Sequence, residues 1–301
     1  IAQLALNIKM NDLDKDYYKI YLKTLNSVSV KDIYKVAQKY IKPNNCNIVI
    51  VGNKDIAKKL ETFDGDNKIT YYDFQGKIVK METKTIADGV TVESIIQKNI
   101  EVLGGEKSMN NWDNVKLNSE LEIQGAPMKI DLEQGYKKPN MFYMSMQAKM
   151  LGEIQGMKYN GEKASMSGMQ GDKVLSENDI QKEMESFFLY PILERNQLEH
   201  KFELKDIETV NEKDAYKIIR TNKLDEKKSM YFDIESGHLV KEIFEEDGMQ
   251  NIVEYSEYSK YENLILPSNT TISVNSEQGT QIIKVVLKEV IINQGIEDSK
   301  F

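Results

Sequence analysis

From Val115 onward the chain alternates apolar and polar residues, and this two-residue period constrains the fold more than any other feature. In segment 115–124, for example, Val115, Leu117 and Leu121 alternate with lysine, asparagine and glutamate. Successive side chains of a strand point to opposite faces, so the pattern predicts strands with one buried and one solvated face. Half-buried strands of this kind are typical of antiparallel sheets.

About eleven segments fit such strands, and turns rich in glycine, proline and asparagine separate them. Two predicted helices, 91–103 and 177–189, are available to cover the apolar face. We therefore expect an α+β fold in which a curved antiparallel sheet, an incomplete β-barrel, is covered by helices. The predicted strands are 115–124, 128–133, 142–150, 153–159, 201–209, 215–221, 228–234, 239–246, 249–256, 267–275 and 281–292.

The start of the chain has a mixed helix-and-strand pattern instead. Ser29, with Asp32 three residues later, predicts a capping box at the start of a helix that Pro43 ends. The run from Cys46 to Val51 predicts a short buried strand. The expected organisation is a short α/β domain over 1–75, a polar, lysine-rich linker over 76–90, and the half-barrel domain over 91–301.

Composition excludes several classes of protein. The net charge is −8 and Arg195 and Arg220 are the sole arginines, so the chain is a poor candidate for binding nucleic acid. No run approaches the roughly 18 apolar residues that a membrane-spanning helix needs. A single cysteine excludes an internal disulfide. The chain begins at Ile1 without a leader, and we expect it to be a piece of a longer protein.

Histidine is too scarce for most catalytic arrangements. Residues 196–200 approach the inverted zinc motif H-x-x-E-H and include His200, but Asn196 holds the first ligand position, and an amide is a poor zinc ligand. His238 falls in a predicted turn, where we expect a solvated side chain, and Cys46 is interpreted as a structural thiol. We predict no catalytic residue, no metal site and no cofactor in this chain.

Methionines on the predicted strands are a departure from strand propensity, which favours β-branched and aromatic residues. Methionine adapts to varied apolar shapes, so one interpretation is a cavity for an acyl chain or an apolar peptide. The other is a sheet core filled by the helices 91–103 and 177–189. The candidate ligand-contacting residues are Leu121, Ile123, Met128, Ile130, Leu132, Phe142, Met144, Met146, Met150 and Met157.

Residues 12–75 contain the run DYYKIYLKTLNSVSVKDIYKVAQKYIKPNNCNIVIVGN, which combines two helices, KYI-x-P and a strand ending in V-G. This order resembles the C-terminal end of an insulinase-like (pitrilysin-family) zinc metallopeptidase. The zinc motif of that family lies upstream of such a segment, so the resemblance assigns no catalytic residue here and places zinc in a missing upstream portion. It implies that this portion, or a second chain, is a partner.

Residues 90–301 carry a second resemblance, to the periplasmic lipoprotein-carrier and outer-membrane lipoprotein-sorting superfamily. It rests on the order of VLGG, NSELEIQGAPMKIDLEQG, MYFDIESGHLVKE, Y-x-x-Y-x-x-x-x-x-L-x-L-P and INQGIEDSKF. The resemblance implies an incomplete barrel with helices in its mouth, able in relatives to hold acyl chains, and a location in the periplasm or cell envelope.

Two functional hypotheses follow from the residues and the resemblances together. The first is a non-catalytic C-terminal region of a bacterial envelope zinc metallopeptidase whose half-barrel binds a hydrophobic ligand. The alternative is a structural or interaction module that stabilises or positions the peptidase and has no ligand of its own. Neither hypothesis expects nucleic acid or a membrane-spanning segment.

Overall fold

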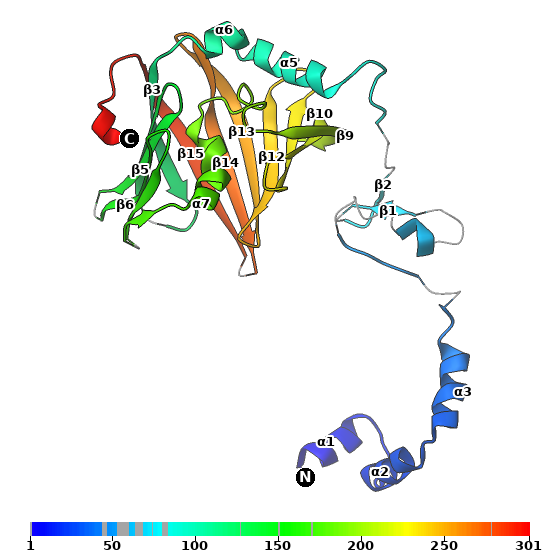
Figure 1. The fold of residues 1–301 in the computed structure, drawn as a ribbon. Coiled ribbons are helices and arrows are strands. Elements are labelled where there is room, and N and C mark those ends of the chain that lie inside the picture. Colours follow the sequence, from blue (N-terminus) through cyan, green and yellow to red (C-terminus); the bar gives the residue numbers. More distant parts are fainter. Residues whose placement is uncertain are drawn as a thin grey trace. The chain divides into compact units, whose positions relative to one another are not determined.

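The computed structural model describes residues 2–43, 47–52, 60–63, 69–73, 75–79, 84–126, 128–149, 151–169, 171–277 and 279–301 (Figure 1). The chain divides into two compact units, Ile1–Met81 and Glu82–Phe301. This division falls within the segment 76–90, whose role as a linker stays a prediction.

The first unit presents helices whose apolar side chains are exposed. It includes α1 (Ala2–Met10), α2 (Tyr17–Ser27) and α3 (Val30–Tyr40), none of which contains a buried residue. The Ser29 side chain accepts a hydrogen bond from the Asp32 amide, and the Asp32 carboxylate accepts one from the Ser29 amide, so the predicted capping box is confirmed. Further along lie the 3₁₀ turn η3 (Glu61–Phe63) and the paired strands β1 (Tyr71–Tyr72) and β2 (Ile78–Val79).

The predicted strand Cys46–Val51 is wrong in the part that the structure describes. Cys46 itself lies outside the described residues, and 47–51 have no strand conformation, with Val51 99% exposed. A strand needs a neighbour to pair its backbone groups, and β-branched composition alone does not supply one. The α/β fold expected for a peptidase-like segment over 1–75 therefore has no support in these residues.

The second unit is built on one open antiparallel sheet of 13 strands in the order β8-β7-β6-β5-β4-β3-β15-β14-β13-β12-β11-β10-β9. Chain order and sheet order agree except where the last strand, β15, pairs with the first, β3. The strands are β3 (Asn114–Ile123), β4 (Lys129–Lys137), β5 (Met141–Ala148), β6 (Gly152–Tyr159), β7 (Ala164–Gly168), β8 (Lys173–Val174), β9 (Lys201–Val210), β10 (Lys213–Thr221), β11 (Lys227–Asp233), β12 (Leu239–Glu246), β13 (Met249–Tyr261), β14 (Leu264–Ser276) and β15 (Gly279–Ile292).

The curved antiparallel sheet is thus confirmed, and every strand predicted over 115–292 is present. The predicted number was too small because β7 and β8 were missed. These edge strands are short, and serine, glycine and lysine dominate the segment, so it lacks the apolar alternation that marks the others.

Helices cover one region of the inner face of the sheet. In Figure 1, α5 (Val92–Val102) and α6 (Gly105–Met109) lie across one end of the strands. The segment formed by α7 (Glu177–Glu183) and the 3₁₀ helix η4 (Met184–Phe187) lies within the curve. Gly104 has φ +100° and Gly105 has φ +81°, a left-handed conformation that ends α5 at the predicted position. A last 3₁₀ turn, η5 (Asp298–Lys300), follows the sheet.

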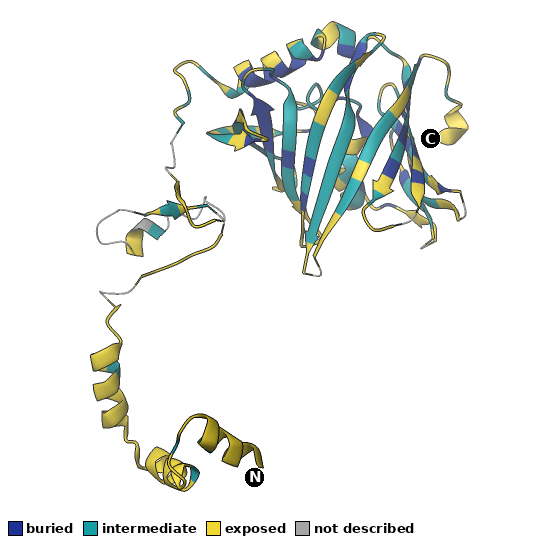
Figure 2. Cartoon of the chain, turned by 180° about the vertical axis from the view of Figure 1, so that it is seen from behind, coloured by how far each residue is buried: buried dark blue, intermediate teal, exposed yellow. Residues whose placement is uncertain are grey.

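The main core lies between these helices and the sheet. The Phe187 ring stacks on Tyr159 at 4.2 Å between centroids and lies 5.6 Å from Phe142. Ile100 of α5 and Met109 of α6 are fully buried in the same cluster. Buried residues gather near this end of the strands, and the strands become more exposed away from it (Figure 2). The α7–η4 segment is therefore a structural part of the core.

Replacing Phe187 with alanine tests this role. The ring is 1% exposed, so its removal should lower the free energy of unfolding by about 3–5 kcal/mol. Urea unfolding followed by the fluorescence of Trp112, the single tryptophan, reports on this unit. Leu151→Ala, at an exposed turn residue, is the control and should cost about 0.5 kcal/mol or less. A loss below about 1 kcal/mol at Phe187 would show that the segment is not integral to the core.

Candidate functional site

The inner face of the sheet has a second apolar region, beside the helix-covered core. Leu121 of β3 pairs with Ile130 of β4 and with Val285 of β15, which places their side chains on the same face. Among the residues that the structure describes, no helix residue belongs to this cluster. We call it the trough, and it comprises Leu121, Ile123, Ile130, Leu132, Met144, Met146, Ile154, Ile283 and Val285.

The structure divides the predicted ligand-contacting residues between these two regions. Phe142 and Met157 lie in the helix-covered core, and Met144 contacts both regions. Met128 precedes β4 and is 36% exposed, and Met150 lies outside the described residues. The interpretation of a core filled by helices is therefore confirmed for Phe142 and Met157, and the interpretation of a ligand cavity stays a prediction. Contact of any of these residues with a ligand stays a prediction. The trough contains the other predicted residues, Leu121, Ile123, Ile130, Leu132 and Met146.

A continuous row of facing residues runs from the trough across the sheet. In order across five adjacent strands, it consists of Ile130, Leu121, Val285, Thr270 and Tyr255. Neighbouring strands lie about 4.8 Å apart, so Leu121 and Tyr255 are separated by about 14 Å along the sheet. The row begins among aliphatic side chains and ends at a phenol hydroxyl, so polarity changes along the inner face.

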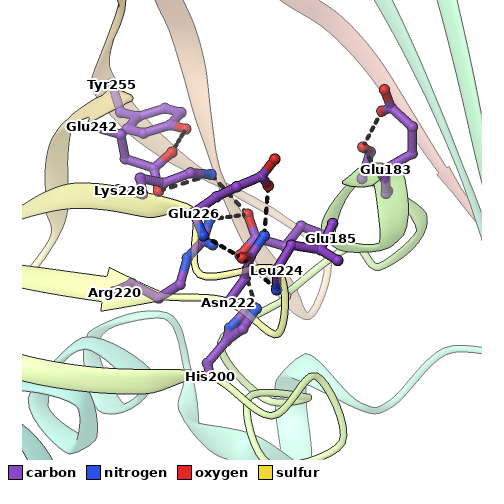
Figure 3. Close-up of polar contacts among 11 residues, drawn as sticks. Glu183, Glu185, His200, Arg220, Asn222, Leu224, Glu226, Lys228, Glu242 and Tyr255 are labelled. Carbon is purple, nitrogen blue, oxygen red and sulfur yellow. Dashed lines mark hydrogen bonds and ion pairs between the residues drawn. The ribbon is translucent and has the colours of Figure 1, made fainter. Parts of the chain in front are cut away.

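Beyond Tyr255 the inner face carries buried charges. The Glu185 carboxylate of η4 lies 2.7 Å from an Arg220 nitrogen and 2.8 Å from Lys228 Nζ, both through Oε2 (Figure 3). Its other oxygen, Oε1, lies 3.1 Å from His200 Nε2. One acidic side chain from the helical segment is thus held by three nitrogen-bearing side chains of the sheet region.

A second carboxylate completes the group. Glu242 Oε2 accepts a 2.6 Å hydrogen bond from the Tyr255 hydroxyl, and Glu242 Oε1 lies 3.7 Å from Lys228 Nζ. Tyr255 therefore joins the row of the trough to the charged residues. We call the group the ionic cluster, and it comprises Glu185, His200, Arg220, Lys228, Glu242 and Tyr255.

Strand register explains why these charges lie on the inner face. Arg220 of β10 pairs with Lys228 of β11, two positions along from the pair formed by Ile218 and Met230, which are buried. Met230 in turn pairs with Glu242 of β12. The Arg220 side chain is 6% exposed, and a buried charge requires a partner. The positive charges of Arg220 and Lys228 are balanced by the negative charges of Glu185 and Glu242, so each buried charge has a partner.

Protonation states follow from the contacts. Burial alone would raise the pKa of Glu185, but Lys228 and Arg220 hold that pKa below its usual value. Burial alone would lower the pKa of Lys228, but Glu242 and Glu185 raise it above its usual value. Burial lowers the pKa of His200 to about 4, so its imidazole is neutral at pH 7.

The sequence expectations overlooked this cluster. In the sequence, His200 belongs to an incomplete zinc motif and Arg220 is one of two arginines, and neither feature points to an ionic cluster. The available signal was a charged residue at an inward position of an apolar strand, two residues after Ile218 or two before Met230. The expectation that His238 is solvated was also wrong, because its turn folds back so that the ring stacks on Tyr258 at 4.2 Å and is half-buried.

A polar groove of about 570 Å³ is lined mostly by residues that alternate with those of the trough along the strands, and Leu132 and Met144 of the trough also line it. Glu133, Glu153, Lys158 and Lys300 are among its lining residues, and this charged lining is unsuited to an acyl chain. Within the described ranges, no group of three or more histidine, cysteine, aspartate or glutamate side chains could hold a metal ion. No helix of the described chain is long and apolar enough to cross a membrane.

No protein-family model and no curated protein matches the chain. Among solved structures it is similar to a LolA superfamily protein from Nitrosomonas europaea, with a TM-score of 0.51 and 13% identity over 70% of this chain and 97% of the other. It is also similar to an outer membrane lipoprotein-sorting protein domain from Vibrio parahaemolyticus, with a TM-score of 0.46 and 11% identity over 68% of this chain and 96% of that one. The first likeness shows a LolA-like fold. Neither shows a fused insulinase-like peptidase.

The depressed pKa of His200 predicts that acid weakens folding. An unfolded His200 gains a proton below about pH 6.5 and the folded one only below about pH 4, so the unfolded state binds more protons in between. The contribution of neutral His200 to the free energy of unfolding is fully present above pH 6.5 and is lost as the pH falls toward 4. When the pH falls from 7 to 5, the free energy of unfolding of the wild type should therefore decrease by about 1–2 kcal/mol more than that of His200→Gln, allowing for solvent screening. Urea unfolding at both pH values measures this, and equal losses would contradict it.

Proposed function

We propose that the second unit binds a hydrophobic ligand in the trough. One observation carries this proposal: a contiguous aliphatic surface lies on the inner face of an open sheet, and no described helix residue contributes to it. Leu121, Ile130 and Leu132 are buried and the other trough residues are partly buried, so the cluster has the apolar lining that ligand-binding sites share. The LolA-like fold supports the proposal, because it agrees with the resemblance of residues 90–301 to lipoprotein carriers, whose members can hold acyl chains.

The chemistry of the trough favours an acyl chain over a peptide. Its side chains are those of leucine, isoleucine, valine and methionine, which offer no hydrogen-bonding groups beyond the weak thioether. A peptide would bring amides that need partners, whereas an acyl chain brings none. Each 100 Å² of apolar surface covered by the chain contributes about 2.5 kcal/mol. Partly buried Met144 and Met146 can adapt to chains of different shape.

The parent protein and its location belong to the same proposal. We infer that the chain acts in the periplasm or cell envelope, as the C-terminal region of a zinc metallopeptidase whose metal would lie in an upstream portion. The motif order in residues 12–75 supports this parentage, and the resemblance of residues 90–301 to periplasmic lipoprotein carriers supports the location.

The alternative, an interaction module without a ligand, is favoured by one observation in the first unit. Helix α3 exposes Ile33, Val36 and Tyr40, three apolar side chains at helical spacing. Such a face is suited to pack on another protein surface, either the upstream peptidase portion or a second chain.

Titration of the full chain against a separately produced upstream portion distinguishes the two hypotheses. If the module hypothesis holds, Ile33→Glu should weaken association at least tenfold, about 1.4 kcal/mol, because a carboxylate enters an apolar contact. Lys31→Glu, at a nearby exposed position of α3, is the charge control. Unchanged affinity in Ile33→Glu would remove α3 from the interface.

A charge placed in the trough tests ligand binding directly. Met146→Lys should weaken binding of the uncharged fluorescent probe N-phenyl-1-naphthylamine at least tenfold, because the ammonium loses hydration when the probe covers it. The matched control is Gln147→Lys, since the next residue of β5 is exposed on the opposite face of the sheet. The affinity of the Gln147→Lys variant for the probe should stay within about twofold of the wild-type value. Equal effects of the two substitutions, or no effect of either, would exclude the trough as the probe's site.

A further inference from the structure

Glu185 is the one acidic group that the helical segment contributes to the ionic cluster. It comes from η4, whereas its partners Arg220 and Lys228 belong to β10 and β11. The Glu185 side chain is 24% exposed, while the Arg220 side chain is 6% exposed. The Glu185 side chain is thus the more accessible of the two.

We propose that Arg220 and Lys228 form the headgroup site of the trough, and that the anionic headgroup of a bound amphiphile replaces the Glu185 carboxylate between them. The ligand class is an acyl chain that ends in a carboxylate or a phosphate. This inference rests on the proposed function, because the acyl chain of the same ligand would occupy the trough.

The geometry around Glu185 is that of an anion site. One carboxylate oxygen receives Arg220 and Lys228 at 2.7 and 2.8 Å, and the other lies 3.1 Å from His200. Charge-assisted contacts of this length bind carboxylate or phosphate oxygens equally well. A second anion of the same size can make the same contacts without rearrangement of the strands.

Charge balance makes the site selective for anions. With Glu185 in place, the two cations are matched by Glu185 and Glu242. Withdrawal of Glu185 leaves one positive charge uncompensated among buried side chains, which is unfavourable unless an anion enters. An uncharged ligand that displaced Glu185 would leave this buried positive charge uncompensated. Selectivity for anions therefore arises from the cost of the uncompensated charge as well as from the contacts that an anion makes with Arg220 and Lys228.

The trough and the cluster are placed so that one ligand can reach both. The row of Leu121, Val285, Thr270 and Tyr255 spans about 14 Å at the usual spacing between strands. Tyr255 contacts Glu242, which lies next to Lys228. Replacement of the Glu185 carboxylate by the headgroup does not require the helical segment to detach, because Phe187, two residues after Glu185, stays packed in the core.

The test compares dodecanoate with methyl dodecanoate, which has the same chain and no charge, by displacement of N-phenyl-1-naphthylamine from the full chain at pH 7.5. The wild type should bind dodecanoate more tightly. Glu185→Gln removes the competing charge and should raise the affinity for dodecanoate about tenfold, about 1.4 kcal/mol, while methyl dodecanoate changes less than twofold. Lys228→Gln should abolish the preference for dodecanoate.

Glu183→Gln is the matched control, because it neutralises a carboxylate of the same segment that accepts a 3.2 Å hydrogen bond from Ser186 instead. It should leave both affinities unchanged. Glu185→Gln retains Lys228 and Arg220, so the outcome does not depend on folding of the Lys228 variant. Acetate and inorganic phosphate, at the same concentrations, test for a site that takes free anions; they should not displace the probe.

Three results would overturn the inference. Equal affinities for the two amphiphiles in the wild type and in Glu185→Gln would remove the headgroup site and leave trough binding intact. Displacement by acetate or phosphate as strong as by dodecanoate would show a free-anion site instead. Failure of both amphiphiles to displace a bound probe, or of the probe to bind, would overturn the proposed function and this inference with it.

Discussion

The stacking of Phe187 on Tyr159 determines how the inner face of the sheet is used. The open sheet of 13 strands carries two apolar clusters on its inner face, and α5, α6 and the α7–η4 segment contribute described residues to one of them, the helix-covered core. Phe187 holds that segment against β5 and β6 at one end of the strands. The aliphatic residues farther along β3, β4 and β15 are left without a helix above them, and the trough is the consequence.

The ionic cluster lies at the far end of the row of residues that begins in the trough. Arg220, Lys228 and Glu242 take inward positions on strands whose neighbouring inward positions are Ile218 and Met230, and Glu185 of η4 meets them there. A buried ion pair contributes little net stability compared with a well-packed apolar group, so stability alone does not account for it. Its position at the end of an apolar row gives it a specific use, since it makes one end of the inner face selective for negative charge.

Much of the sheet could be predicted because apolar and polar residues alternate along each strand, and this local pattern shows which side chains share a face. The ionic cluster could not, since Glu185 meets Arg220 only through the register of β10 and the placement of η4, which depend on tertiary packing. Arg220 and Lys228 were readable as charges at inward positions, but nothing local indicated that they share a partner. The run 47–51 shows the converse, a strand-like composition without a neighbouring strand.

Methyl NMR with a spin-labelled fatty acid measures directly whether the trough is the ligand surface. With the nitroxide near the end of the acyl chain, the methyl signals of Leu121, Ile130 and Ile283 should broaden strongly. The signal of Ile218, buried in a separate cluster beneath α5, should change far less. Equal broadening at Ile218, or broadening confined to the exposed residues of α3 such as Ile33, would show that the ligand does not bind in the trough.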